Sequence, residues 1–188
     1  IMVDIADTPL AVAADAVTNV ELVQPTADNA TIGTSFEGIS NTDADFVNPV
    51  VAGADIDVVS ADAADDSGST GATEVTVTYL DSNFNHATEA ITMNGTTEVE
   101  MTDQTITFIQ KAEVTSTGTG LAAAGAITIA DVTGGGVHAV IDAGAPESGN
   151  CQWMVPAGHT GYIHGFWYDV DAVAAGAGTV EIALQKAE

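Results

Sequence analysis

The clearest pattern in the chain is the alternation of apolar and polar residues in the run TEVTVTYL, residues 73–80. Because side chains on a β-strand point alternately to its two faces, this period of two predicts a strand buried on one side only. A shorter apolar run at 55–60 precedes it, and residues 61–72 between the two are rich in Asp, Gly and Ser, which favour turns. The stretch 55–84 therefore predicts a strand, a polar loop and a second strand, at the centre of a β protein.

The same scheme continues to the C-terminus. The dipeptide Asn94-Gly95 stands between two alternating runs and predicts a β-hairpin, because Asn-Gly favours two-residue turns. The glycine-rich residues 133–136 likewise predict that the runs on either side of them pair. Strands of this length and spacing predict an all-β fold, an antiparallel β-sandwich of jelly-roll-like type. The further predicted strands are residues 87–93, 97–101, 105–115, 125–130, 137–142, 151–155, 160–170 and 178–186.

The N-terminal part is less regular. Two interpretations of residues 1–19 stay open, a short helix with Thr8 as its cap or an extended arm. A short strand is expected at 19–24, and an edge strand at 46–51, since this run contains a proline. The composition favours a boundary near residue 52. We therefore expect residues 1–52 to form an arm or small β subdomain for assembly or attachment, and residues 53–188 to form the sandwich.

The charge balance narrows the class of protein. The chain has 27 acidic residues against 2 lysines and no arginine, a formal net charge of −25. Such a chain repels itself in dilute buffer, but at about 1 M salt the Debye length falls to about 3 Å and the repulsion is screened. The composition thus favours a protein of strong brine over an ordinary acidic surface protein. It also excludes direct nucleic-acid binding, because almost nothing is present to neutralise phosphates.

Membrane and disulfide features are not predicted. The longest uncharged run, residues 148–168, contains a proline and four glycines and is not uniformly apolar, so no membrane span is expected. Cys151 is the only cysteine, which excludes an intrachain disulfide and favours a buried, inert thiol. No signal peptide is recognisable and the first residue is Ile, which we interpret as the mark of a processed or trimmed chain.

Several phrases of the sequence together resemble a known family. They are VVSADAADDSGSTGATEVTVTYLDSNFN, ATEAITMNGTTEVEM, VTSTGTGLAAAGAITI and WMVPAGHTGYIHGFW, in this order, over about three fifths of the chain. This succession resembles a virion structural protein of tailed viruses, in which an SxxxxDxxxGTGA turn precedes a YLD strand, an NGTT hairpin follows, and a VPAGK strand comes last. His159 stands where that family usually carries lysine, and relatives often continue beyond the last phrase.

The resemblance implies an external capsid or tail component, such as a decoration, turret or fibre protein, without enzymatic activity. Together with the charge, it implies a virus of halophilic archaea, with the protein on the virion surface in high salt. The expected partners are copies of the chain in a trimer or pentamer, other virion proteins and a host-surface glycan. Two alternatives remain, a haloarchaeal cell-surface or adhesin domain that binds carbohydrate, and a secreted glycan-active enzyme. The nucleophile, phosphate-loop and zinc-helix motifs of common enzymes are absent from the sequence.

One candidate ion site lies in the polar loop. Asp62, Asp65 and Asp66, with Ser67 and Ser69, offer oxygen ligands of the kind that hard cations prefer, so calcium, magnesium or sodium is the expected occupant. The spacing lacks the closing Glu of an EF-hand, and a solvated acidic turn is the alternative.

A second candidate is the aromatic run near the C-terminus. Tyr162, Phe166 and Tyr168 are expected on one face of a strand, with Trp167 on the other. Aromatic residues on both faces predict a central strand, or one covered by a neighbouring subunit, and so a role in the core or in assembly. If they are exposed, they form a platform for sugars instead.

A third candidate is a zinc site with His159, His164 and Cys151 as ligands. The two histidines are five positions apart on a predicted strand, which turns them to opposite faces. They are therefore expected to be ordinary turn and strand residues.

Overall fold

The described part of the protein is an antiparallel β-sandwich. The computed structural model describes residues 50, 55–132, 136–149 and 152–163 of the 188 residues. Within these residues there are seven strands, all paired antiparallel, and no helix. One sheet has the order β4-β1-β6-β7 and the other β3-β2-β5. The strands are β1 (Ile56–Ser60), β2 (Ala72–Leu80), β3 (His86–Thr92), β4 (Val99–Glu100), β5 (Phe108–Thr117), β6 (Ile127–Asp131) and β7 (Val137–Ile141).

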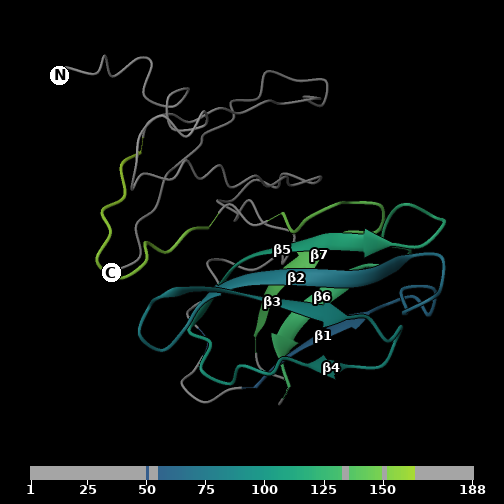
Figure 1. Ribbon diagram of the computed structural model, residues 1–188, viewed down its shortest axis with the longest axis horizontal. Helices are drawn as coiled ribbons and strands as arrows, with labels where there is room; N and C mark the ends of the chain where they lie inside the picture. Colours follow the sequence, from purple (N-terminus) through teal and green to yellow (C-terminus); the bar gives the residue numbers. More distant parts are fainter. Residues whose placement is uncertain (1–49, 51–54, 133–135, 150–151, 164–188) are drawn as a thin grey trace, which may run out of the picture.

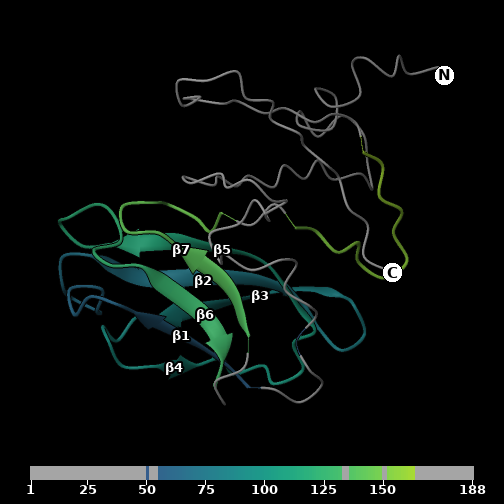
Figure 2. The same cartoon turned by 180° about the vertical axis from the view of Figure 1, so that it is seen from behind.

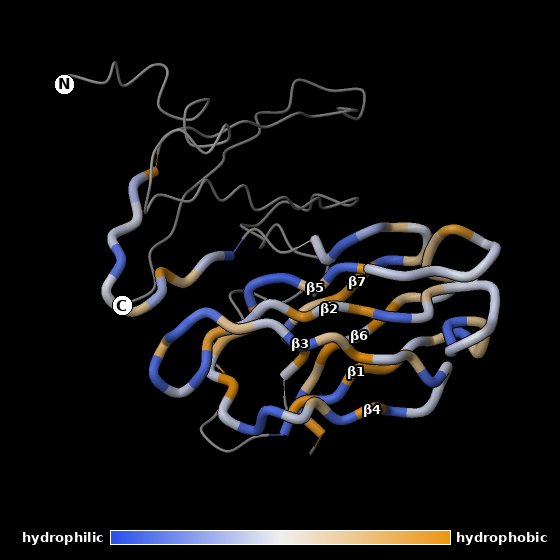
Figure 3. The backbone as a smooth tube through the Cα atoms, viewed as in Figure 1, coloured by the Kyte–Doolittle hydropathy of each residue, from blue (hydrophilic) through white to orange (hydrophobic). Residues whose placement is uncertain are grey.

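The two sheets pack face to face, as the two opposite views show (Figures 1 and 2). The strand predicted from alternation is β2, and its residues Val75, Val77 and Tyr79 are buried in the core, as expected. Across the sandwich, β1 and β6 contribute residues of the same kind, among them Val58 and Ile129. Apolar residues recur along the strands, whereas the loops after β1 and β2 are largely polar (Figure 3). The predicted all-β sandwich is confirmed, while the finer jelly-roll type stays a prediction.

One predicted hairpin is confirmed and one is wrong. The runs around 133–136 pair as β6 and β7, with Ile127 opposite Ile141. The runs around Asn94-Gly95 do not pair with each other, because β3 pairs with β2 and β4 pairs with β1 in the other sheet. The Asn-Gly turn instead carries the chain from one sheet to the other.

The physical reason lies in the hydrogen bonds of this turn. The amide of Gly95 donates to the carbonyl of Asp65 at 2.7 Å, and the amide of Ser60 donates to the carbonyl of Gly95 at 3.2 Å. Asn94 forms a β-bridge with Asp66. The turn is therefore bound to the loop after β1, a partner distant in sequence, and does not close a local ladder.

Other strands differ from the prediction in length or presence. The run at 97–101 forms only the two residues of β4, and the strand expected at 105–115 starts later, as β5. Before β5, the carboxylate of Asp103 accepts hydrogen bonds from both the amide and the hydroxyl of Thr105, each at 2.7 Å, which favours a turn. Residues 152–155 and 160–163 contain no strand, contrary to expectation.

Several predictions fall on residues that the structure does not describe. They include the elements at 1–19, 19–24 and 178–186, and the expected domain boundary near residue 52. The division into residues 1–52 and 53–188 accordingly stays a prediction.

Candidate functional site

The loop after β1 folds around the carboxylate of Asp65, which is fully buried. Its Oδ1 accepts hydrogen bonds from the amides of Ala72 (2.6 Å) and Ala124 (2.8 Å). Its Oδ2 accepts from the hydroxyl of Ser60 (2.6 Å) and the amide of Gly125 (2.9 Å). One side chain thus joins the end of β1, the start of β2 and the segment before β6. We call these five residues, together with Gly71 and Gly118, the Asp65 junction.

Glycines let the backbones approach closely at this junction. The amide of Gly118 donates to the carbonyl of Gly71 at 2.8 Å. A Cβ at Gly118 would overlap the carbonyl oxygen of Ser69, and a Cβ at Gly125 would lie 2.7 Å from the amide nitrogen of Asp62. Only glycine fits at such contacts, because any side chain would force the two loops apart. The glycines therefore let the segments come close enough for the carboxylate of Asp65 to join them.

The hydrogen bonds determine the charge state of Asp65. Burial by itself raises the pKa of a carboxyl, since it disfavours the charged form. Here the donors outweigh burial: the amide of Ala124, the hydroxyl of Ser60 and the amides of Gly125 and Ala72 hold the pKa of Asp65 below its usual value of 3.8. The carboxylate is ionised at neutral pH and serves as an acceptor for donors from three segments.

The three aspartates of the predicted ion site have different environments. Both oxygens of Asp65 are engaged in the junction. Asp62 is exposed and its Oδ1 accepts from the amide of Ala64 at 2.8 Å, which is a local turn contact. Among the described residues, no group of three His, Cys, Asp or Glu side chains is arranged to hold a metal ion. A hard cation bound by Asp62, Asp65 and Asp66 stays a prediction.

A second buried aspartate was not singled out by the sequence. Asp57 stands between the core residues Ile56 and Val58 of β1, so alternation turns it to the outer face, yet it is only 5% exposed. Its partner across the β1–β4 pair is Glu100. Burial raises the pKa of Asp57, and the nearby carboxylates of Glu98, Asp131 and Glu100 raise it further.

A histidine and an aspartate meet at the β6–β7 turn. The Nε2 of His138 lies 2.8 Å from Oδ1 of Asp131, and both side chains are more than nine-tenths buried. The other oxygen of Asp131 accepts from the amide of Gly136 at 2.9 Å. This pair joins the two strands of the hairpin that the glycine-rich turn predicts. The only sign of the pair in the sequence is that Asp131 and His138 stand on either side of that turn.

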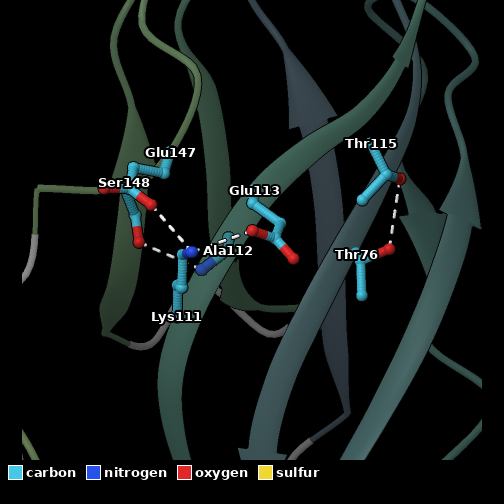
Figure 4. A network of polar contacts seen from close by, with 7 residues as sticks. All are labelled: Thr76, Lys111, Ala112, Glu113, Thr115, Glu147 and Ser148. Carbon is cyan, nitrogen blue, oxygen red and sulfur yellow. Dashed lines mark hydrogen bonds and ion pairs between the residues drawn. The ribbon is translucent and has the colours of Figure 1, made fainter. Parts of the chain in front are cut away.

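The residues after β7 cover the edge of β5. The carbonyl of Pro146 accepts from the amide of Val114, and the amide of Ser148 donates to the carbonyl of Ala112, each at 2.8 Å. The hydroxyl of Ser148 accepts from the amide of Ala112 at 3.0 Å. Beside these bonds, Lys111 forms ion pairs with Glu113 on β5 and with Glu147, which lies among the residues after β7 (Figure 4).

The predicted aromatic strand is described only at its start. Tyr162 is 88% exposed and lies in no strand, so it is not part of the sandwich core. Phe166, Trp167 and Tyr168 lie outside the described residues, as do His164 and Cys151 of the candidate zinc site. His159 is exposed, with its Nδ1 2.9 Å from the carbonyl of Ala157. The role of this run in assembly stays a prediction.

A different aromatic group lies at the end of the sandwich where β2 stops. The rings of His86 and Trp153 approach to 6.3 Å between centroids, at an interplanar angle of 40°. Two positions before His86, Phe84 is 43% exposed and has a φ of 60°. A residue with a Cβ costs about 1–2 kcal/mol in this left-handed region. The sequence signal that could have found this group is the phrase SNFNH itself, an aromatic residue between turn-forming asparagines.

Residues 152–157 hold this aromatic group in place. The side-chain amide of Gln110 on β5 donates to the carbonyl of Met154 at 2.6 Å, and the amide of Ala157 donates to the carbonyl of Phe84 at 2.8 Å. The segment therefore reaches both edge strands of the β3-β2-β5 sheet. At the end of β2, Leu80 is fully buried, although alternation places it on the same face as the outward-facing residues of that strand.

Comparison with known proteins gives no match: no family model, no curated protein and no solved structure is similar to the chain. Among the described residues, no helix is long and apolar enough to span a membrane.

Proposed function

We propose that this chain is a non-enzymatic structural protein on the outer surface of a halophilic virus, a capsid decoration, turret or fibre component that acts as a homo-oligomer. The observation that carries the proposal is the ordered set of phrases that resembles a virion protein family. Two of these phrases, VVSADAADDSGSTGATEV and VTSTGTGLAAAGAITI, are separated in sequence and meet at the Asp65 junction.

The Asp65 junction gives a physical reason for the residue types at several positions of the motif that carries the resemblance. In the SxxxxDxxxGTGA pattern, Ser60 and Asp65 are the hydrogen-bonded pair, and Gly71 and Ala72 are the close approach and the amide donor that follow. In the other phrase, Gly118 packs on the first loop. Residues that depend on one another structurally make a more informative resemblance than the same number of scattered identities.

The charge supports the high-salt setting. Against a net charge of −25, the described residues contain a single lysine, which is already paired with two glutamates. Subunits of this composition have few cations for intersubunit ion pairs, so contacts between copies must be apolar and hydrogen-bonded. We propose a cyclic trimer or pentamer in which residues 1–45 contribute to attachment or packing, alongside other virion proteins.

The second candidate is a haloarchaeal cell-surface or adhesin domain that binds carbohydrate. The observation that favours it is the exposed aromatic and amide group around Phe84, since aromatic faces and amides are common in sugar recognition.

The two candidates predict different locations. Particles purified from an infected haloarchaeal culture should contain the protein, and antibodies against the folded protein should label their outer surface. Light scattering in molar salt should give a trimer or pentamer, and removal of residues 1–45 should reduce this mass or abolish binding to particles. A protein found in the envelope of uninfected cells and absent from particles would refute the virion proposal and support the adhesin.

A further inference from the structure

The end of the sandwich opposite the Asp65 junction carries aromatic and polar groups that are exposed or half-buried. Strand β2 runs from the junction at Ala72 to Leu80, so the loop 81–85 lies at the far end, on the left in Figure 1. There the rings of His86 and Trp153 meet, and the loop carries the partly exposed Phe84 two positions before His86. Aromatic residues from two distant segments thus share one end of the fold.

The backbone holds Phe84 in its unusual conformation from both sides. Its amide donates to the carbonyl of Asp81 at 2.9 Å, and its carbonyl accepts from the amide of Ala157 at 2.8 Å. The asparagines on either side would adopt a positive φ more readily than phenylalanine. The loop nevertheless places its aromatic residue there, partly exposed, as binding loops often do at the expense of local strain.

The polar groups of the same loop form an ordered pair of acceptor and donor. Oδ1 of Asp81 accepts from the amides of Asn83 and Asn85, both at 2.8 Å. Oδ2 lies 3.3 Å from the side-chain amide of Asn85. The backbone amide of Asn85 and the other contacts of this loop lower the pKa of Asp81, so it is ionised at neutral pH. Two neighbouring hydroxyls of a sugar need such an acceptor beside a donor.

The charge of the chain restricts the ligand. The chain offers phosphates, sulfated glycans and other polyanions almost no cation to bind, because it has 2 lysines and no arginine against 27 acidic residues. Stacking on an aromatic ring and hydrogen bonds to hydroxyls require no ionic attraction, and they persist where salt screens charges. Neutral, hydroxyl-rich ligands are the class that this surface fits.

We propose that the loop 81–86 and residues 152–157 form a binding site for a neutral saccharide, which places its apolar face on Phe84 and its hydroxyls on Asp81 and Asn85. The site does not depend on the virion assignment, because the isolated protein carries all of these residues. A sugar titration therefore tests it without particles, and its failure leaves the location experiment unaffected.

The test uses ¹⁵N-labelled full-length protein in about 1 M KCl, titrated with methyl glycosides of glucose, galactose, mannose and N-acetylglucosamine. At least one glycoside should give saturable chemical-shift changes confined to residues 81–86 and 152–157. Phe84→Ala should weaken that binding about tenfold, as expected for the loss of one stacking contact. Asn85→Ala should also weaken it, and the spectrum of the rest of the sandwich should remain unchanged in both variants.

The matched control is Leu121→Ala. Leu121 is also an exposed apolar residue at positive φ, 82% exposed with φ 62°, but it belongs to the loop at the opposite end. This variant should bind the glycoside as the wild type does. The proposal is overturned if no neutral glycoside gives saturable shifts in the folded protein, if binding survives Phe84→Ala, or if only anionic glycans bind.

Discussion

Asp57 and Asp65 are both buried aspartates, one within β1 and one in the loop that follows it, and their surroundings are opposite. Asp65 faces four hydrogen-bond donors, which lower its pKa although burial acts against them. The pKa of Asp57 is raised, mainly by burial and further by the nearby carboxylates of Glu98 and other acidic residues. Burial alone therefore does not determine whether a carboxylate stabilises this fold. The number of donors aimed at it does.

The largest expected effect comes from removing the charge of Asp65. In Asp65→Asn the shape is kept, but an NH₂ group replaces one acceptor oxygen and faces donors, so up to two of the four hydrogen bonds are lost. We expect a loss of about 3–5 kcal/mol in the free energy of unfolding, because buried donors are left unpaired. Urea denaturation in about 1 M KCl measures it.

The control for this change is Asp66→Asn in the same loop, where the side chain is only half-buried and accepts no hydrogen bond from the part of the chain that the structure describes. Its effect should stay within about 0.5 kcal/mol. Equal effects of the two substitutions would show that the junction does not depend on the carboxylate of Asp65.

The next effect concerns the close approach of the two loops. Gly118→Ala places a Cβ against the carbonyl of Ser69 and should cost about 1–3 kcal/mol, since the backbone contact must open. Gly68→Ala is the matched control, because Gly68 has φ +87° but open space around it. It should cost about 1 kcal/mol from backbone strain alone. If Gly118→Ala costs less than Gly68→Ala in urea denaturation, the loops are not packed as described.

The sequence predicts the features that depend on local patterns, and it misses those that depend on contacts between distant segments. The buried face of β2 and the pairing of β6 with β7 follow from local alternation and a glycine-rich turn, and both were predicted. The Asn94-Gly95 hairpin was wrong because that turn binds the loop around Asp65, which is distant in sequence. Likewise, the composition of the polar loop points to three aspartates. Asp65 differs from the other two because the amides of Ala124 and Gly125, which are distant in sequence, donate hydrogen bonds to its carboxylate.

The acidic surroundings of Asp57 predict a smaller effect of opposite sign. A carboxyl whose folded pKa lies above the unfolded value of 3.8 destabilises the fold at neutral pH, and the fold regains stability as the pH falls through the raised pKa towards 3.8. Asp57→Asn should therefore stabilise the protein at neutral pH by about 0.5–1 kcal/mol, as for relief of a like-charge pair across strands. This gain should shrink on mild acidification.

Urea denaturation between neutral pH and about pH 4, at about 0.1 M and about 1 M KCl, tests this sign. For Asp65 the sign is reversed: its lowered pKa stabilises the fold above 3.8, and this stability is lost as the pH falls below 3.8 towards the folded pKa. A gain from Asp57→Asn that is independent of both pH and salt would contradict the electrostatic explanation.

The smallest effect is expected from the ion pairs at the covered edge of β5, where charge and backbone contributions can be separated. Lys111 is paired with Glu113 and Glu147, at 2.8 and 2.7 Å, but all three side chains are more than a third exposed. Lys111→Gln should therefore cost at most about 0.5 kcal/mol at about 0.1 M salt and nothing measurable at about 1 M, where exposed pairs are screened.

Ser148→Ala should cost more, about 1 kcal/mol at either salt concentration, because Ser148 is buried and its hydroxyl accepts from the amide of Ala112. Urea denaturation of the two variants at both salt concentrations compares them directly. If the lysine variant is the more destabilised in molar salt, ion pairs hold this edge. If the serine variant is, neutral hydrogen bonds to the backbone hold it, as we expect for a chain with so few cations.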